Sequence, residues 1–192
     1  MSTLQSGHII TDGLVIALDA ANTKSYPGSG TTWSDLSGNS NNGTLTNGPT
    51  FNSRNGGSIV FDGVDDYVTL GTPSILNGVQ LPLTICGWGN LSTVSGFRTL
   101  YGVYSNTTGG NIYSLIRVDD GTLRYFASTS GGGYQFNDSF SITTNIWYFY
   151  TVVVSGSLSS PNVTIYRNDS FQSFSYSPFT SDRKSTRLNS SH

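Results

Sequence analysis

A succession of short, alternating apolar segments separated by turn residues is the feature that most limits the fold of this chain. Residues 147–154 form the most apolar of these segments, and residues 163–167 and 171–176 flank a turn at Asn168-Asp169. Asp120-Gly121 is a strong signal for a type I′ turn between two further strands. About a dozen such segments occur and no helical periodicity competes with them. The sequence therefore predicts an all-β protein, an antiparallel β-sandwich of jelly-roll type.

The first strand is expected at residues 14–19, which are apolar almost throughout. Residues 73–77 are the one place where a helical turn is expected. The other strands are predicted at residues 43–46, 58–61, 67–70, 83–90, 97–104, 111–118, 122–127 and 134–136.

An acidic corner separates two of these strands, in the stretch SIVFDGVDDYVTL of residues 58–70. Gly63 supplies the left-handed backbone conformation that a sharp corner requires. Three carboxylates within five residues repel one another unless they are solvated, hydrogen-bonded or neutralised, and calcium prefers such oxygen ligands. Asp62, Asp65 and Asp66 are therefore candidate ligands of a structural Ca²⁺. The alternative is that Asp62 and Asp65 cap the turn through backbone N–H groups while Asp66 points to solvent.

A second polar loop, Asp35-x-Ser37-x-Asn39-x-Asn41, also spaces oxygen ligands alternately. It fails the EF-hand pattern, because Ser40 stands where that loop needs glycine and Thr46 where it needs glutamate. Side chains that hydrogen-bond the local backbone are the better interpretation.

The run GSIVFDGVDDYV, residues 57–68, resembles the signature of laminin-G-like (LamG, concanavalin-A-like) jelly-roll domains. The resemblance extends from about Gly13 to about Ser177 and includes GLVIALD, WSDLSGNSNNGTL, LTICGW and WYFYTVVV. More narrowly, the combination is similar to LamG modules of bacteriophage structural and tail-fibre proteins. It implies a virion component that binds a glycan or host-surface receptor and packs against other virion subunits. The alternatives are a ligand-free structural spacer or capsid decoration domain, and a fragment of a secreted, extracellular bacterial adhesin.

The amino-acid composition limits the classes of function that are expected for this chain. All eleven acidic residues are aspartates, whereas the glucanases that the resemblance implies use a pair of glutamates, so no enzymatic activity is expected. The net charge of −2 supplies no basic footprint for nucleic acid, and no apolar stretch is long enough for membrane insertion. The single cysteine, Cys86, excludes an internal disulfide and is interpreted as a buried, inert thiol.

Aromatic side chains on an open sheet face can stack against sugars. Trp88, Tyr113 and Tyr148 are the candidates for this role, and Arg117 and Arg124 could add hydrogen bonds to hydroxyls or carboxylates. The alternative for each aromatic residue is packing in the core or at an edge.

The chain is predicted to have a polar lead-in at residues 1–12 and one sandwich at 13–181. The last segment, DRKSTRLNSSH at 182–192, carries three of the nine Lys and Arg residues and lacks strand alternation. This segment resembles the translation of a sequencing adapter. We therefore expect a non-native tail and a sandwich that is truncated at its C-terminal end, near Thr180.

Overall fold

The computed structural model describes residues 11–71, 81–107, 110–129, 132–157, 160–168 and 170–174. The chain divides into two compact units, Met1–Ile75 and Leu76–His192. The predicted helical turn at residues 73–77 and the predicted tail at 182–192 lie outside the described residues. Within them, no helix is long and apolar enough to cross a membrane.

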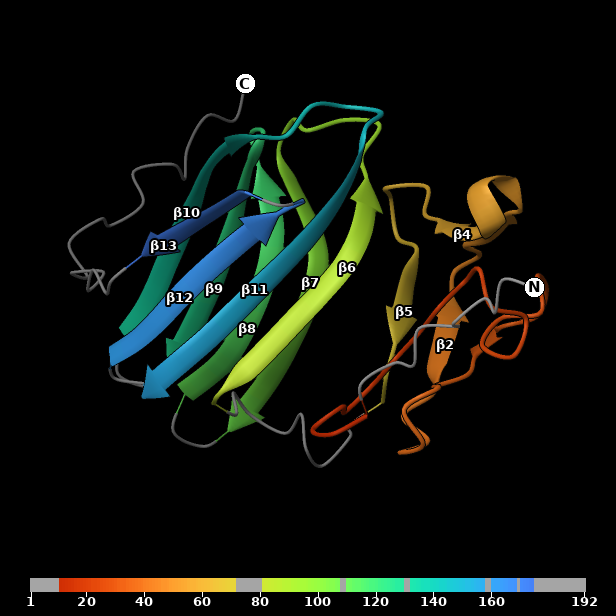
Figure 1. Ribbon diagram of the computed structural model, residues 1–192, viewed down its shortest axis with the longest axis horizontal. Coiled ribbons are helices and arrows are strands. Elements are labelled where there is room, and N and C mark those ends of the chain that lie inside the picture. Colours follow the sequence, from red (N-terminus) through yellow and green to blue (C-terminus); the bar gives the residue numbers. More distant parts are fainter. Residues whose placement is uncertain are drawn as a thin grey trace, which may run out of the picture. The chain divides into compact units, whose positions relative to one another are not determined.

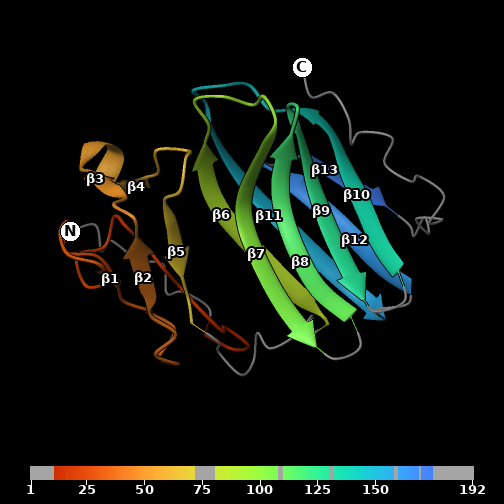
Figure 2. The same ribbon diagram turned by 180° about the vertical axis from the view of Figure 1, so that it is seen from behind.

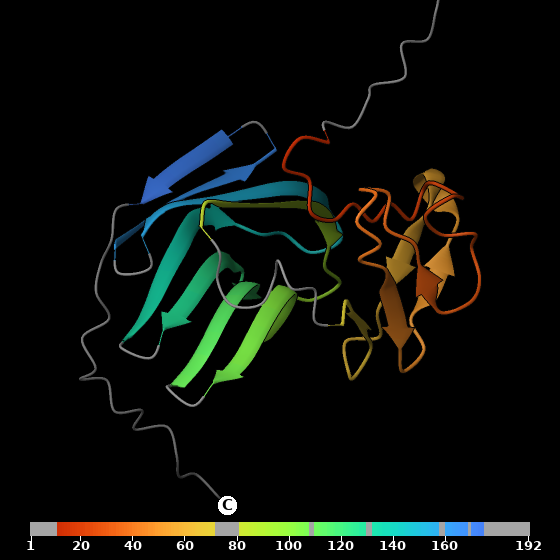
Figure 3. The same cartoon turned by 90° about the horizontal axis from the view of Figure 1, so that it is seen from below.

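The second unit is a sandwich of two four-stranded antiparallel sheets (Figures 1 and 3). Sheet I has the order β10-β9-β8-β7, and sheet II has the order β13-β12-β11-β6. The strands are β6 (Leu83–Asn90), β7 (Phe97–Thr107), β8 (Gly110–Asp119), β9 (Thr122–Thr129), β10 (Gly132–Ser141), β11 (Trp147–Ser157), β12 (Ser160–Arg167) and β13 (Ser170–Phe174). The all-β prediction is confirmed.

Period-2 alternation builds the core of this unit from both sheets, since every second side chain of a strand points inward. Val152 on β11 and Ile165 on β12 are paired across sheet II, and both are fully buried. Ile116 and Tyr125 hold the equivalent cross-strand positions in sheet I. The remaining buried members of the cluster are Val118, Leu123, Ile142, Val154 and Val163.

Turn chemistry sets the connection between β8 and β9. Asp120 and Gly121 both have positive φ, 46° and 82°, as a type I′ turn requires. The turn prediction is confirmed. The neighbouring hairpin differs from its prediction, because β7 and β8 continue to Thr107 and Gly110 and take up most of the expected loop.

The first unit contains two small antiparallel sheets (Figure 2). One has the order β1-β2-β5, with β1 (Thr32–Trp33), β2 (Gly43–Thr46) and β5 (Tyr67–Thr69). The other pairs β3 (Thr50–Asn52) with β4 (Ser58–Val60) through a 3-10 turn at Arg54–Gly56. Buried Tyr26 lies between Trp33 and Phe51, with ring centroids 6.4 Å and 5.5 Å away.

The predicted strand at residues 14–19 is wrong, because this segment forms no strand with any of the described residues. Instead, side chains from the loop at residues 35–41 form hydrogen bonds with backbone N–H and carbonyl groups of residues 14–19. The Ala17 N–H donates to the Asp35 carboxylate at 2.8 Å, and the amides of Asn39 and Asn41 donate to the Val15 carbonyl at 3.2 and 2.8 Å. Side-chain hydrogen bonds therefore satisfy backbone groups of this apolar run that a neighbouring strand would otherwise have satisfied.

The same loop confirms the interpretation of its polar residues as turn-forming. The Asp35 carboxylate accepts hydrogen bonds from the Ser37 N–H, the Ser37 hydroxyl and the Asn41 N–H, at 2.7–3.0 Å. Partial burial raises the pKa of Asp35, but these bonds outweigh it and leave the pKa below its usual value. The carboxylate organises the loop as an acceptor.

Candidate functional site

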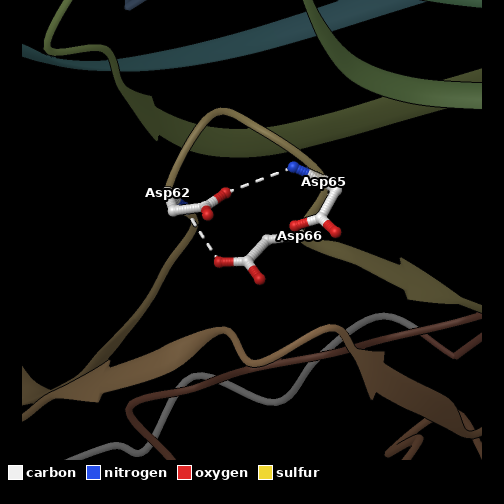
Figure 4. A group of neighbouring side chains, drawn as sticks. All are labelled: Asp62, Asp65 and Asp66. Atoms are coloured by element: carbon white, nitrogen blue, oxygen red, sulfur yellow. Dashed lines mark hydrogen bonds between the residues drawn. The ribbon is translucent and has the colours of Figure 1, made fainter.

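The acidic corner connects strands of two different sheets, since β4 pairs with β3 whereas β5 pairs with β2. Its aspartates fold the corner locally (Figure 4). The Asp62 carboxylate accepts from the N–H groups of Val64 and Asp65, at 2.8 and 3.3 Å. The Asp66 carboxylate in turn accepts a hydrogen bond from the Asp62 N–H at 2.9 Å. Gly63, with φ of 78°, permits the reversal.

These hydrogen bonds test the alternative interpretation of the corner, in which Asp62 and Asp65 cap the turn and Asp66 points to solvent. Asp62 caps the turn as expected. Asp66 does not simply point to solvent, because it is half-buried and bonded to the backbone of Asp62. Asp65 is tied from outside the corner, by the Asn47 amide, which donates to its carbonyl at 2.8 Å and to its carboxylate at 3.2 Å. Asn47 has a left-handed φ of 69°, and the turn-forming Asn47-Gly48 pair was the available sequence signal for it.

Hydrogen bonding within the corner favours the charged form of Asp62. The hydrogen bond from the Val64 N–H is the main reason that the pKa of Asp62 lies below its usual value of 3.8. One oxygen from each of the three aspartates lies within 4.8 Å of the others. Two oxygens that are each about 2.4 Å from one Ca²⁺ can be at most about 4.8 Å apart, so this spacing fits. The triad, with Asp62 and Asp65 exposed, could therefore bind a metal ion.

Trp88 lies on the outward face of sheet II. Alternation along β6 turns Thr84, Cys86 and Trp88 to the exposed side. The Trp88 side chain is 65% exposed, and its ring centroid lies 5.2 Å from that of Phe149, its partner across β6 and β11. The interpretation of Cys86 as a buried thiol is wrong, because this alternation exposes it.

Tyr148 lies on the opposite side of sheet II from Trp88. It is the cross-strand partner of Gly89 and packs against the core cluster. Its hydroxyl accepts from the Thr143 N–H at 3.3 Å, and the Arg167 guanidinium lies 5.3 Å from its ring centre. Tyr113 belongs to β8 in sheet I, and its side chain lies outside the described residues. The structure therefore does not bring Trp88 and Tyr148 into one site.

Two exposed aromatic residues that the sequence reasoning missed share the face of Trp88. Trp147 is 41% exposed and lies two residues from Phe149, and Tyr166 is 38% exposed and pairs with Thr151. We call Trp88, Trp147, Phe149 and Tyr166 the outer aromatic face. Strict alternation along residues 147–154 was the signal, since it separates Trp147 and Phe149 from Tyr148.

Arg117 and Arg124 lie in sheet I, directly opposite each other on β8 and β9. Arg124 Nη1 donates to the Asp119 carboxylate, and Arg117 Nη2 lies 3.6 Å from the same oxygen. Asp119 is buried. The structure thus brings the two arginines together around the Asp119 carboxylate, whose contact with them was not predicted.

The family model of the concanavalin A-like lectin/glucanase superfamily, of laminin G type, matches residues 62–185. The match covers more than half of the chain, and the protein belongs to this superfamily. No curated protein and no solved structure shows significant similarity to it. The match begins at the acidic corner and includes strands β6 to β13 of the sandwich. Whether the native domain occupies residues 13–181 stays a prediction.

Proposed function

We propose that this protein is a non-catalytic recognition module that binds carbohydrate, or a receptor that carries it, in an appendage of a phage particle. The outer aromatic face carries the proposal. Trp88 exposes most of its surface while its ring packs against Phe149, which holds the indole in place for a sugar ring to stack on it. The superfamily contains both lectins and glucanases, and the absence of glutamate favours the binding role.

Binding to a glycan array by the full chain, compared with Trp88→Ala, tests the proposal. Loss of one stacking aromatic should weaken binding by about tenfold, the equivalent of roughly 1.4 kcal/mol. Tyr67→Ala is the matched control, because Tyr67 is an exposed aromatic on β5, outside this face. A flat array for the unaltered protein would favour the ligand-free spacer or capsid decoration domain instead.

The virion location rests on similarity to the LamG modules of phage proteins. Reading the gene with several kilobases on either side tests it. Neighbouring tail and capsid genes would support the proposal, and an upstream signal peptide would favour the secreted adhesin.

Structural Ca²⁺ at Asp62, Asp65 and Asp66 is a separate part of the proposal. Calorimetric titration with CaCl₂ should give saturable heat that Asp65→Asn weakens, because that change removes a charged oxygen ligand. Asp12→Asn, at an exposed residue outside the triad, is the control. Absence of heat would refute the calcium site and leave the recognition role standing.

A further inference from the structure

Two arginines face each other in sheet I with one carboxylate between them. Arg117 and Arg124 are direct cross-strand partners, an arrangement that is destabilising for like charges unless an anion offsets it. Asp119 bonds to Arg124 and lies 3.6 Å from Arg117. It is a single buried carboxylate shared by two guanidinium groups. The pair retains one positive charge in excess.

This excess is local to the two arginines and Asp119. The other charged residues of sheet I and its β8–β9 turn are Arg98, Asp120 and Asp138, the last of which belongs to β10. Counted over all of these residues the net charge is zero, so the excess belongs to the arginine pair and not to the whole sheet. An anion is the ligand that this local excess attracts.

Aromatic packing holds the Arg117 guanidinium in place. Its central carbon lies 4.2 Å from the ring centre of Phe97 and 4.0 Å from that of Phe126. Such stacking fixes the plane of the guanidinium and reduces the entropy that ligand binding would otherwise cost. The side chains of Arg117 and Arg124 remain 22% and 25% exposed, and the Nε atom of each is buried without a hydrogen-bond partner among the described residues. A ligand cannot reach the buried Nε atoms, so a further acceptor would bind the Nη donors of these partly exposed side chains.

We propose that Arg117 and Arg124 bind the carboxylate of an acidic sugar such as a hexuronate. Guanidinium groups suit carboxylates because their paired N–H donors match two oxygens. Phe97 is 63% exposed beside Arg117, and it offers the apolar surface that a sugar ring can cover. This site takes its ligand class, a saccharide, from the proposed function, but it lies on a different sheet from the outer aromatic face.

Nuclear magnetic resonance of the ¹⁵N-labelled full chain tests the site directly, through the Nε–H signals of Arg117 and Arg124. Sodium glucuronate should shift both signals saturably, whereas glucose should not, and sodium acetate should bind at least about tenfold more weakly. Absence of a shift with glucuronate, or an equal response to glucose, would overturn the proposal. Equal affinity for acetate would also overturn it, because the site would then recognise a bare carboxylate such as that of an acidic peptide. The Trp88 indole signal reports the outer aromatic face separately.

Substitutions at the proposed site provide a second test of it. Arg124→Gln should weaken glucuronate binding at least about tenfold, and Arg124→Lys should fall between it and the unaltered protein, since it keeps the charge but loses the paired donors. Arg54→Gln is the matched control, because Arg54 is an exposed arginine of the first unit. Circular dichroism verifies that each variant is folded. Unchanged binding by folded Arg124→Gln would refute the assignment.

Discussion

Two glycines with left-handed backbone allow a sharp test of how the first unit is packed. Gly57 has φ of 138°, and a Cβ there would lie 2.5 Å from the Ala20 carbonyl oxygen and 3.0 Å from the Phe51 ring. Gly63, in the acidic corner, has φ of 78° and no heavy atom within 4 Å of the same position. Substituting alanine at either site forces an unfavourable φ, but only Gly57→Ala adds a collision with backbone.

The magnitudes follow from these two contributions. Left-handed backbone costs an L-residue about 1–2 kcal/mol, which is the whole effect expected for Gly63→Ala. Overpacking adds about 1–3 kcal/mol, so Gly57→Ala should lower the free energy of unfolding by about 2–5 kcal/mol. With an m-value of about 2 kcal/mol/M, the urea midpoint should fall by about 1–2.5 M for Gly57→Ala and about 0.5–1 M for Gly63→Ala.

The measurement is urea unfolding followed by tryptophan fluorescence. A background with Trp88→Phe and Trp147→Phe leaves Trp33 as the remaining tryptophan, and Trp33 belongs to the first unit. Both glycine variants are compared in that background. Equal midpoints for the two variants would refute the reasoning, since they would show that the segment around Ala20 does not pack against Gly57.

Two further predictions concern pH. Burial raises the pKa values of Tyr101 and Tyr150 to about 12, so their contribution to stability is complete below about pH 10 and is lost as pH rises through 12. An absorbance titration should leave both neutral at pH 11, and a single midpoint near 10 for all eleven tyrosines would contradict this. The lowered pKa of Asp62 gives stability that is present above pH 3.8 and is lost as pH falls through the folded value. Asp62→Asn should therefore flatten the fall in urea midpoint between pH 5 and pH 3, and an unchanged fall would show that Asp62 takes no part in it.

The turns, the cap and the strand alternation could be predicted from the sequence because they depend on residues that are close together along the chain. The turn at Asp120-Gly121 needs only residues that tolerate positive φ, and the Asp62 cap needs only N–H groups two and three residues away. Alternation along β6 likewise separates Trp88 and Cys86 from Ile85. These are properties of short segments, and tertiary packing left them unchanged.

Residues 14–19 show where such rules fail. An apolar run predicts a strand, but a strand needs a partner, and the side chains of Asp35, Asn39 and Asn41 took the hydrogen bonds that a partner would have made. Tyr148 shows a related limit, because choosing it as a ligand residue required knowing which side of its strand faces the other sheet.

The sequence by itself determined an all-β chain, its superfamily, its turns and an acidic corner, because strand periodicity and turn preferences are local. Only the tertiary structure decided which strands pair beyond the hairpins that the turns predict. That pairing placed Phe149 beside Trp88, and the folded hairpin brought Asp119 beside both Arg117 and Arg124. Register between strands depends on burying one face of every strand at once, so it is a property of the whole sandwich.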